Sequence, residues 1–385
     1  MTRPATTESF APLAATLPPG PAEIHAQLQA LAGRRVAVAL SGGVDSAVAA
    51  LRLKRAGADV VALALRLHDV DPSLPAAPRA CCAPDDLQDA RRVAEALDVP
   101  LYVMDARAAF EEAVVEPFVG AYFSGQTPAP CVACNARVKL GRLWERARVL
   151  GAEALATGHY ARTTRDGRLY RGVDREKDQS YFLFSTPSPV LRDLVLPLGA
   201  AEKRTVRAEA LASGLPVAHK LDSQEVCFVG GSGAKGFLRR RAGERDGGAI
   251  VDSEGRELGR HDGFWQYTVG QRRGTGVAGG RRLYVLRVEA ESRTVVVGDD
   301  AELLERALSA TSVRWISRAP SGSVRARVKI RSRDPGTSAD VHLEPDGSVE
   351  VRFDQPVRAI APGQAAVFYV DDEVIGGGFI RGACG

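Results

Sequence analysis

The chain has 385 residues, of which 45% are hydrophobic and 25% are charged, and its formal net charge is +4. A chain of this length and composition can bury a sizeable core, and we expect it to form two or three domains. The small net charge does not by itself predict a polyanionic partner, so a nucleic-acid surface would depend on local clusters of arginine. No stretch approaches the roughly 18 apolar residues of a membrane span, and no secretory signal pattern is seen. We therefore expect a cytoplasmic protein whose six cysteines stay reduced.

Residues 1–33 are expected to form a mostly flexible N-terminal extension, because they are rich in Ala, Pro and Thr and hold one short helical pattern at 22–31. Residues 34–224 then alternate apolar runs with helical patterns. Strands are predicted at 36–40, 59–65, 101–104 and 154–157, and helices at 47–56, 86–97 and 137–150. This alternation is typical of a parallel sheet with crossover helices, so we predict an α/β domain.

The rest of the chain is expected to be β-rich, with a central domain at 225–305 and a C-terminal β-barrel at 306–385. Strands at 249–251, 283–288 and 294–297 have the close spacing of antiparallel hairpins. A further strand at 323–331 alternates basic and apolar residues. Its basic stripe, Arg327, Lys329, Arg331 and Arg333, is interpreted either as an RNA phosphate surface or as an ordinary solvated strand face.

A glycine-containing loop, Ser41-Gly42-Gly43-Val44-Asp45-Ser46, directly follows the first predicted strand and precedes a helix. In that position a loop presents backbone N–H groups and a positive helix end to phosphate. No lysine sits in the loop, so the amides and the Ser41 and Ser46 hydroxyls would make the contacts, and Asp45 could orient a magnesium ion. A serine-capped turn without a ligand is the alternative.

This loop resembles that of the N-type ATP pyrophosphatase (PP-loop) family, in which the Ser-Gly-Gly-x-Asp-Ser loop binds the pyrophosphate of ATP and leaves AMP on an oxygen of the substrate. The resemblance implies a parallel-sheet fold like that of the adenine nucleotide alpha hydrolases, with ATP and Mg²⁺ as cofactors.

Two thiols, Cys131 and Cys134, are expected on a proline-fixed loop directly before a basic helix. A helix N-terminus raises the thiolate fraction of a nearby cysteine. Cys227 lies much further along the chain, and one more thiolate there would complete a sulfur-transfer pair with Cys134. Zinc is disfavoured, because no second Cys-x-x-Cys and no close His pair completes a four-ligand site.

Five further stretches, at 127–135, 157–162, 177–183, 222–228 and 267–273, together with the phosphate loop, resemble the tRNA-specific 2-thiouridylase family. The resemblance runs in order from Arg34 to the C-terminus. It implies ATP-dependent 2-thiolation of the wobble uridine of tRNA. The protein is expected to act as a monomer, without a membrane, and to receive sulfur through a relay from a cysteine desulfurase.

The same resemblance assigns site residues. Cys134 takes the nucleophile position and Cys227 the persulfide position. The ATP pocket comprises Ala39, Leu40, Ser41, Gly42, Gly43, Val44, Asp45, Ser46, Leu65 and Gly158. The RNA contacts comprise Ala129, Pro130, Cys131, Lys177, Asp178, Gln179, Arg331 and Ser332. Family members more often have Asn than Ala at position 129, which weakens a side-chain contact there.

Two sulfur routes are compatible with these cysteines. In the first, the uridine C2 oxygen is adenylated, Cys134 attacks the inner or outer sulfur of a Cys227 persulfide, and the two cysteines end as a disulfide. In the second, Cys131, Cys134 and Cys227 hold a [4Fe–4S] cluster whose open iron binds sulfide. Two other functions remain as alternatives: an amidating synthetase that needs no thiols, and a non-catalytic tRNA-binding or iron–sulfur protein.

Overall fold

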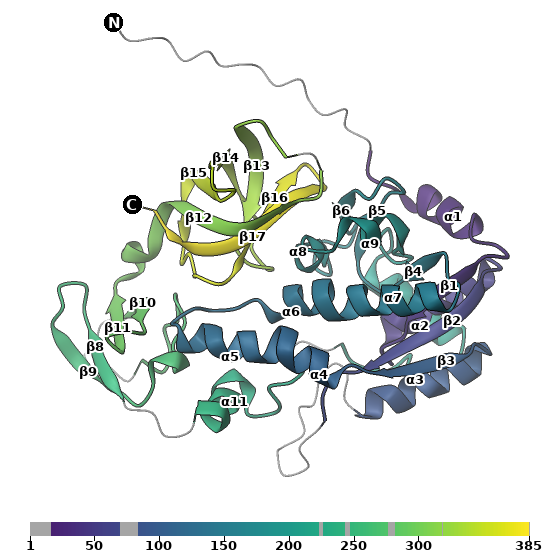
Figure 1. Cartoon of the computed structure of the whole chain (residues 1–385), viewed down its shortest axis with the longest axis horizontal. Helices are drawn as coiled ribbons and strands as arrows, with labels where there is room; N and C mark the ends of the chain where they lie inside the picture. The colour runs from purple at the N-terminus through teal and green to yellow at the C-terminus, as the bar shows by residue number, and fades with distance from the viewer. Residues whose placement is uncertain are drawn as a thin grey trace, which may run out of the picture.

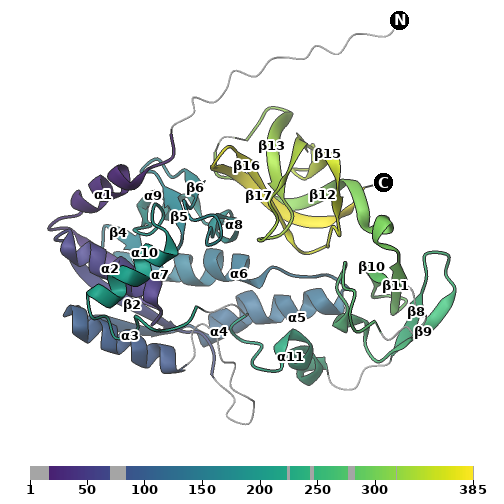
Figure 2. The same ribbon diagram turned by 180° about the vertical axis from the view of Figure 1, so that it is seen from behind.

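The computed structural model describes residues 17–69, 84–222, 226–242, 247–275, 282–317 and 319–384. Three units follow one another along the chain in Figure 1: an α/β domain, a small β-rich domain and a closed barrel whose last strands are yellow. Figure 2 shows the same arrangement from behind, with the barrel above the long helices of the first domain. In the described ranges, no helix is long and apolar enough to cross a membrane.

A five-stranded parallel sheet forms the centre of the first domain, in the order β3-β2-β1-β4-β7. Its strands are β1 (Arg35–Ala39), β2 (Asp59–Arg66), β3 (Leu101–Asp105), β4 (Ala154–Ala156) and β7 (Leu194–Val195). Alternate residues of β1 face two different buried clusters, with Ala37 in one and Val38 in the other. Both faces of the sheet are covered, which explains the uninterrupted apolar runs. The α/β prediction is confirmed.

One face of this sheet is covered by α1 (Pro21–Gln29), α2 (Val44–Arg55), α3 (Pro84–Leu97) and α10 (Lys203–Ala212). Helix α1 contributes Ile24 and Leu28 to the buried cluster, and Leu31 follows them. The prediction of a flexible extension is therefore wrong for residues 17–33, because the apolar face of α1 packs into this buried cluster. Residues 1–16 lie outside the described residues, as do Cys81 and Cys82.

Two long helical runs cover the other face and lie side by side in both views (Figures 1 and 2). The first consists of α4 (Arg107–Phe110), the π-helical turn η1 (Glu111–Val115) and α5 (Glu116–Phe123). The second consists of α6 (Pro130–Ala133), the π-helical turn η2 (Cys134–Lys139) and α7 (Leu140–Val149). The predicted loop at Cys131 and Cys134 is wrong: the helix begins at Pro130, since proline is favoured in a first helical turn.

The middle domain contains α11 (Gly233–Ala242), β8 (Gly248–Val251), β9 (Glu257–His261), the short 3-10 helix η3 (Phe264–Gln266), β10 (Tyr284–Glu289) and β11 (Thr294–Gly298). Its sheet has the order β10-β11-β8-β9. The pair β10–β11 is antiparallel as expected. The strand β9, which was not predicted, pairs antiparallel with β8, whereas β11 and β8 run parallel.

The C-terminal domain is a closed barrel of six antiparallel strands, because β17 pairs with both β16 and β12. After the 3-10 helix η4 (Asp300–Leu303) come β12 (Leu304–Trp315), β13 (Ser323–Lys329), β14 (Thr337–Leu343), β15 (Val349–Arg358), β16 (Ala365–Val370) and β17 (Glu373–Ala383). A separate buried cluster fills the barrel. The barrel prediction is confirmed.

The barrel is attached to the first domain by strand pairing and by side chains. A hairpin of the first domain, β5 (Ala161–Thr163) and β6 (Leu169–Arg171), extends the barrel sheet by pairing with β17. Between the hairpin and α10 lie α8 (Ser180–Leu183) and α9 (Ser188–Asp193). The hydroxyl of Tyr181 donates to the carbonyl of Ala365 at 2.9 Å, and Gln364 Nε2 donates to the carbonyl of Thr127 at 3.0 Å. The barrel is therefore fixed against the segment that leads into α6.

Candidate functional site

A cavity of about 1140 Å³ begins at the carboxyl ends of β1 and β4 and reaches the barrel. The strand order of the sheet reverses between these two strands, and ligands of open α/β sheets bind at such a point. Most of the predicted site residues line this cavity: Ala39, Leu40, Ser41, Gly43, Val44, Asp45, Ser46, Leu65, Pro130, Cys131, Cys134, Gly158, Lys177, Asp178, Gln179, Cys227 and Ser332. Three predicted residues, Gly42, Ala129 and Arg331, are not part of its lining.

The phosphate loop is held by its own hydroxyl groups. Ser46 Oγ donates to the carbonyl of Gly43 at 3.0 Å and accepts from the amide of Ser41 at 3.2 Å. Ser46 itself is buried, whereas Ser41 is exposed. The loop therefore closes on Ser46 and presents Ser41 and the N-terminus of α2 to the cavity, as anion binding requires.

At two positions in or near the phosphate loop, only glycine leaves room for a neighbouring backbone segment. Gly42 has a φ of +72°, and a Cβ there would lie 2.1 Å from the carbonyl oxygen of Asp86. A Cβ on Gly158 would lie 2.7 Å from both the carbonyl carbon of Asp45 and the amide nitrogen of Ser46. The loop after β4 thus packs directly on the backbone of the phosphate loop, and no side chain fits between them.

Asp45 is enclosed by two residues that the sequence did not single out. Lys203 Nζ lies 2.7 Å and 2.8 Å from its two carboxylate oxygens, and the hydroxyl of Tyr160 donates to it at 2.8 Å. Lys203 also pairs with Asp222 at 2.8 Å. Burial of the phenol, followed by the charge of Asp45, raises the pKa of Tyr160, so Tyr160 acts as a donor throughout the neutral range.

The segment that leads to Cys227 contacts the phosphate loop directly through Lys220 and indirectly through Asp222, which pairs with Lys203. Lys220 Nζ donates to the carbonyl of Gly42 at 3.1 Å and also binds Asp86 and Asp89. Asp222 pairs with Lys203, with Lys177 at 2.8 Å and with Arg207 at 3.0 Å. Burial acts to raise the pKa of Asp222, but hydrogen bonds from Lys177 and Lys203 outweigh it and lower the pKa.

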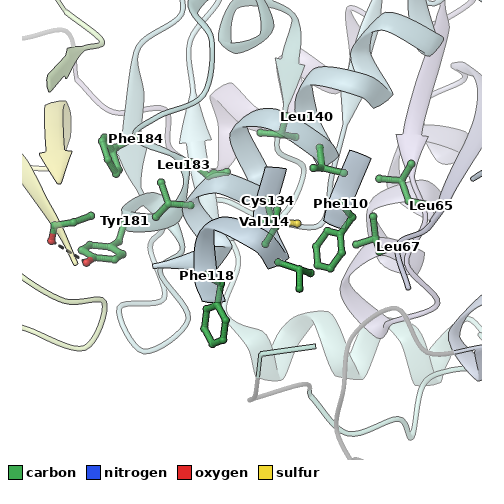
Figure 3. Close-up of a cluster of buried hydrophobic side chains, with 14 of the residues drawn as sticks. Leu65, Leu67, Phe110, Val114, Phe118, Cys134, Leu140, Tyr181, Leu183 and Phe184 are labelled. Atoms are coloured by element: carbon green, nitrogen blue, oxygen red, sulfur yellow. Dashed lines mark hydrogen bonds between the residues drawn. The ribbon is translucent and has the colours of Figure 1, made fainter. Parts of the chain in front are cut away.

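Cys134 lies at the first position of the π-helical turn η2 and is 6% exposed. Figure 3 shows its side chain among buried apolar residues that include Phe110, Val114 and Leu140. The next residue, Asn135, is also buried and donates to the carbonyl of Phe182 at 3.3 Å. A π-helical turn is uncommon and frequently marks a functional site, because it shifts side chains out of the regular helical register. Cys131 lies one turn earlier and is exposed.

Cys227 is half-buried and is followed by Phe228, whose ring packs edge-on against three other phenylalanines. The ring centroids of Phe118 and Phe228 are 5.0 Å apart. Phe110, which packs beside Cys134, is 5.6 Å from Phe228. The two cysteines are therefore brought to one cavity by a shared aromatic cluster, from segments that are far apart in the sequence.

The predicted RNA contacts differ in how their side chains are used. Lys177 pairs with Asp222, Gln179 Oε1 accepts from the amide of Tyr160 at 2.9 Å, and Asp178 accepts from the amide of Ser180 at 3.0 Å. These contacts shape the cavity wall from within the protein. Arg331 is exposed and donates to the carbonyl of Arg358, outside the cavity.

The cysteines do not form the arrangement that a metal cluster needs. Among the residues that the structure describes, no three His, Cys, Asp or Glu side chains are gathered closely enough to hold a metal ion. Cys131, Cys134 and Cys227 are all described, and they line the cavity without making such a group. The residues present do not fit the [4Fe–4S] interpretation.

His159 lies in the cavity wall next to Gly158, with its Nδ1 2.8 Å from the hydroxyl of Thr157. Burial, with a smaller contribution from Lys139, lowers the pKa of His159 to about 3. The ring is therefore neutral at physiological pH, which suits a hydrogen-bonding role better than proton transfer.

Sequence reasoning missed Tyr160, Lys203, Lys220 and Asp222. None of them belongs to the phosphate loop, and the contacts of Tyr160, Lys203 and Lys220 with that loop join residues 115 to 178 positions apart. Asp222 pairs with Lys177, which is 45 positions away. Tyr160 and Asp222 stood within stretches that carried the family resemblance, which was the only signal available.

Three protein families match successive parts of the chain. The family described as tRNA methyl transferase HUP domain matches residues 34–231, the tRNA methyl transferase PRC-barrel domain matches 235–299, and the Aminomethyltransferase beta-barrel domain matches 305–380.

Curated relatives match along nearly the whole chain, and each is named tRNA-specific 2-thiouridylase MnmA. The protein of Rhodospirillum centenum is 47% identical, over 90% of this chain and 91% of its own length. That of Geobacter metallireducens is 45% identical, over 91% of this chain and 98% of its own. That of Sorangium cellulosum is 46% identical, over 91% and 93%.

Proposed function

Because the chain belongs to the tRNA-specific 2-thiouridylase family, we propose that its cavity activates the wobble uridine of a tRNA with ATP and delivers sulfur from a cysteine persulfide. The enzyme acts on tRNA and thiolates uridine. The observation that carries the proposal is that the phosphate loop, Cys134 and Cys227 line one continuous cavity.

The first step is adenylation. The amides at the start of α2 and the exposed hydroxyl of Ser41 bind the β- and γ-phosphates of ATP. The C2 oxygen of the uridine attacks the α-phosphorus, the bond to the β-phosphate oxygen breaks, and pyrophosphate leaves. A magnesium ion bound with ATP would neutralise phosphate charge, and Asp45 would hold it by exchanging contacts that its carboxylate now makes with Lys203 and Tyr160.

The second step transfers sulfur. Cys227 carries the persulfide, and the Cys134 thiolate attacks its inner sulfur, so that the S–S bond breaks and hydrosulfide leaves. The sulfane sulfur is reduced, and the two cysteines are oxidised to a disulfide that an external thiol must reduce. Hydrosulfide adds to the activated C2 carbon, and AMP departs as the thiocarbonyl forms.

The apolar surroundings of Cys134 support the proposed release of hydrosulfide and its addition to the activated uridine. Phe110, Val114 and Leu140 all line the cavity beside it, and all three are almost fully buried. Hydrosulfide released here meets the activated uridine where water is scarce, which favours thiolation over hydrolysis. We further infer that the protein works as a monomer and receives its persulfide from a cysteine desulfurase relay.

The test compares Cys134→Ser and Cys227→Ser with wild type and with Cys384→Ser, a control at the C-terminal end of β17 outside the cavity. We expect both cavity variants to lose 2-thiouridine formation, measured by mass spectrometry of digested tRNA, while tRNA-dependent pyrophosphate release, which reports adenylation, persists for one turnover. The control should keep both activities. Full turnover in both cavity variants would contradict the persulfide route and favour an amidating enzyme.

A further inference from the structure

Two cationic side chains meet where the barrel joins the first domain. Lys329 is the last residue of β13, and Arg171 is the last residue of β6. Lys329 is only 8% exposed, although both residues line the cavity. The basic stripe expected on this strand is therefore not uniformly solvated: Arg327 is exposed, whereas Lys329, the next basic residue on that face, is buried.

Both cations lie against the ring of Tyr369. The guanidinium carbon of Arg171 lies 4.0 Å from the ring centroid, and Lys329 Nζ lies 5.9 Å from it. Tyr369 is fully buried, and its hydroxyl lies 3.2 Å from Ser180 Oγ. A desolvated cation–π contact of this kind stabilises and orients a cation without satisfying its N–H donors.

Two donors of Arg171 find no acceptor in the described part of the protein. Arg171 Nε and Nη2 are buried without a hydrogen-bond partner, and Lys329 lies beside them against the same ring. The nearby carboxylates are used by the backbone: Asp178 accepts from the amides of Gly172 and Ser180, and Asp334 accepts from the amides of Ile330 and Gly336. A further cation, Arg175, is paired with Asp372 at 2.6 Å.

Buried donors without acceptors are costly, and their occurrence in pairs indicates a ligand with several anionic oxygens. The Nε–Nη2 edge of arginine matches two oxygens of a phosphate, and a lysine ammonium can bind a third. Burial lowers the pKa of Lys329, and Asp178 partly opposes this, so an approaching anion would further stabilise the charged form.

We propose that Lys329 and Arg171 form a binding subsite for one backbone phosphate of the RNA, beside the uridine that is thiolated. The proposal rests on the proposed function, because it needs RNA in the cavity. The neighbours of the subsite are Asp178 and Asp334 rather than the phosphate loop, which favours an RNA phosphate over the pyrophosphate of ATP. Because the Nε–Nη2 edge of Arg171 is covered, Arg171 has to rotate against the Tyr369 ring before this edge can bind the phosphate.

The experiment measures binding of an anticodon stem–loop RNA to the full chain by fluorescence anisotropy, with single phosphates replaced in turn by neutral methylphosphonates. In wild type, one position should weaken binding about tenfold. Lys329→Met should weaken binding of the unmodified RNA to the same extent, remove the penalty at that position only, and reduce the salt-dependence slope by about one. Lys329→Arg should retain binding.

The matched control is Arg325→Gln, an exposed residue on the same face of β13 that is paired with Asp340 and Asp354. It should leave the methylphosphonate pattern unchanged, and thermal unfolding identifies any variant that fails to fold. An unchanged pattern in Lys329→Met would overturn the subsite. Weaker pyrophosphate inhibition in that variant, with RNA affinity unchanged, would overturn the RNA assignment. Loss of thiolation by wild type with RNA binding intact would contradict the proposed function alone.

Discussion

The two walls of the cavity are built in different ways. The phosphate-loop wall is one continuous segment, from Ala39 to Ser46, that hydrogen-bonds to itself through Ser46. The cysteine wall joins the helix at Cys134 to the segment at Cys227, which is held by Phe228 on one side and by Lys220 and Asp222 on the other. The first wall depends on backbone geometry, and the second depends on side-chain packing and ion pairs. Damage to each wall should therefore affect a different step of the reaction.

The largest expected effect is on the phosphate-loop wall. Gly158→Ala places a methyl group against the backbone of Asp45 and Ser46, and neither backbone can give way without moving the loop. We expect ATP affinity, measured by calorimetry, to fall about a hundredfold, equivalent to ~2.7 kcal/mol. The control Gly120→Ala adds a methyl group in open space on α5 and should bind ATP normally. An unchanged affinity in Gly158→Ala would mean that the loop after β4 can move aside.

The second-largest effect is expected on the cysteine wall. Phe228→Ala removes a ring that contacts Phe110, Phe118 and Phe237, so the position of Cys227 is no longer fixed. We expect single-turnover thiolation to slow about thirtyfold, or ~2 kcal/mol, while ATP affinity changes less than about twofold. Phe228→Leu should recover part of the rate. Equal losses in both measurements would show that the two walls are not separable.

A smaller effect is expected at the connection between the walls. Asp222→Asn leaves Lys177 and Lys203 without their shared counter-charge, and we expect thiolation to fall about tenfold. Asp262→Asn, an exposed carboxylate paired with Arg239, is the control and should keep full activity. A normal rate in Asp222→Asn would assign the network to stability alone, which urea unfolding would reveal.

The smallest effect is a dependence of stability on pH. The pKa of His159 is about 3 in the folded protein, against 6.5 for a free imidazole. The unfolded chain therefore binds a proton first, so stability is complete above about pH 6.5 and falls as the pH decreases towards 3. Between about pH 7 and pH 5, calorimetry should show the melting temperature of wild type falling a few degrees more than that of His159→Gln. Identical slopes would show that His159 is accessible to protons in the folded state.

Local sequence patterns were sufficient to predict much of the fold. The uninterrupted apolar runs predicted β1 and β2, because a strand buried on both faces needs no polar alternation. They did not predict that Ile24 and Leu28 pack onto the sheet, since a single short helical pattern in an Ala- and Pro-rich segment gives no sign of what covers it. The start of the helix at Pro130 was also missed, because two prolines so close together are equally typical of a loop.

By itself, the sequence predicted the phosphate loop from residue types at fixed spacing, and its resemblance to the tRNA-specific 2-thiouridylase family assigned Cys134 and Cys227 as the reactive thiols. Only the tertiary structure decided that Cys134 and Cys227 share a cavity, that Lys203 and Asp222 connect the phosphate loop to the cysteine segment, and that Lys329 is buried rather than solvated. The physical reason is that these features depend on contacts between separate segments, such as Lys203 and Asp45, which are 158 positions apart, and no local pattern records which side chains will meet.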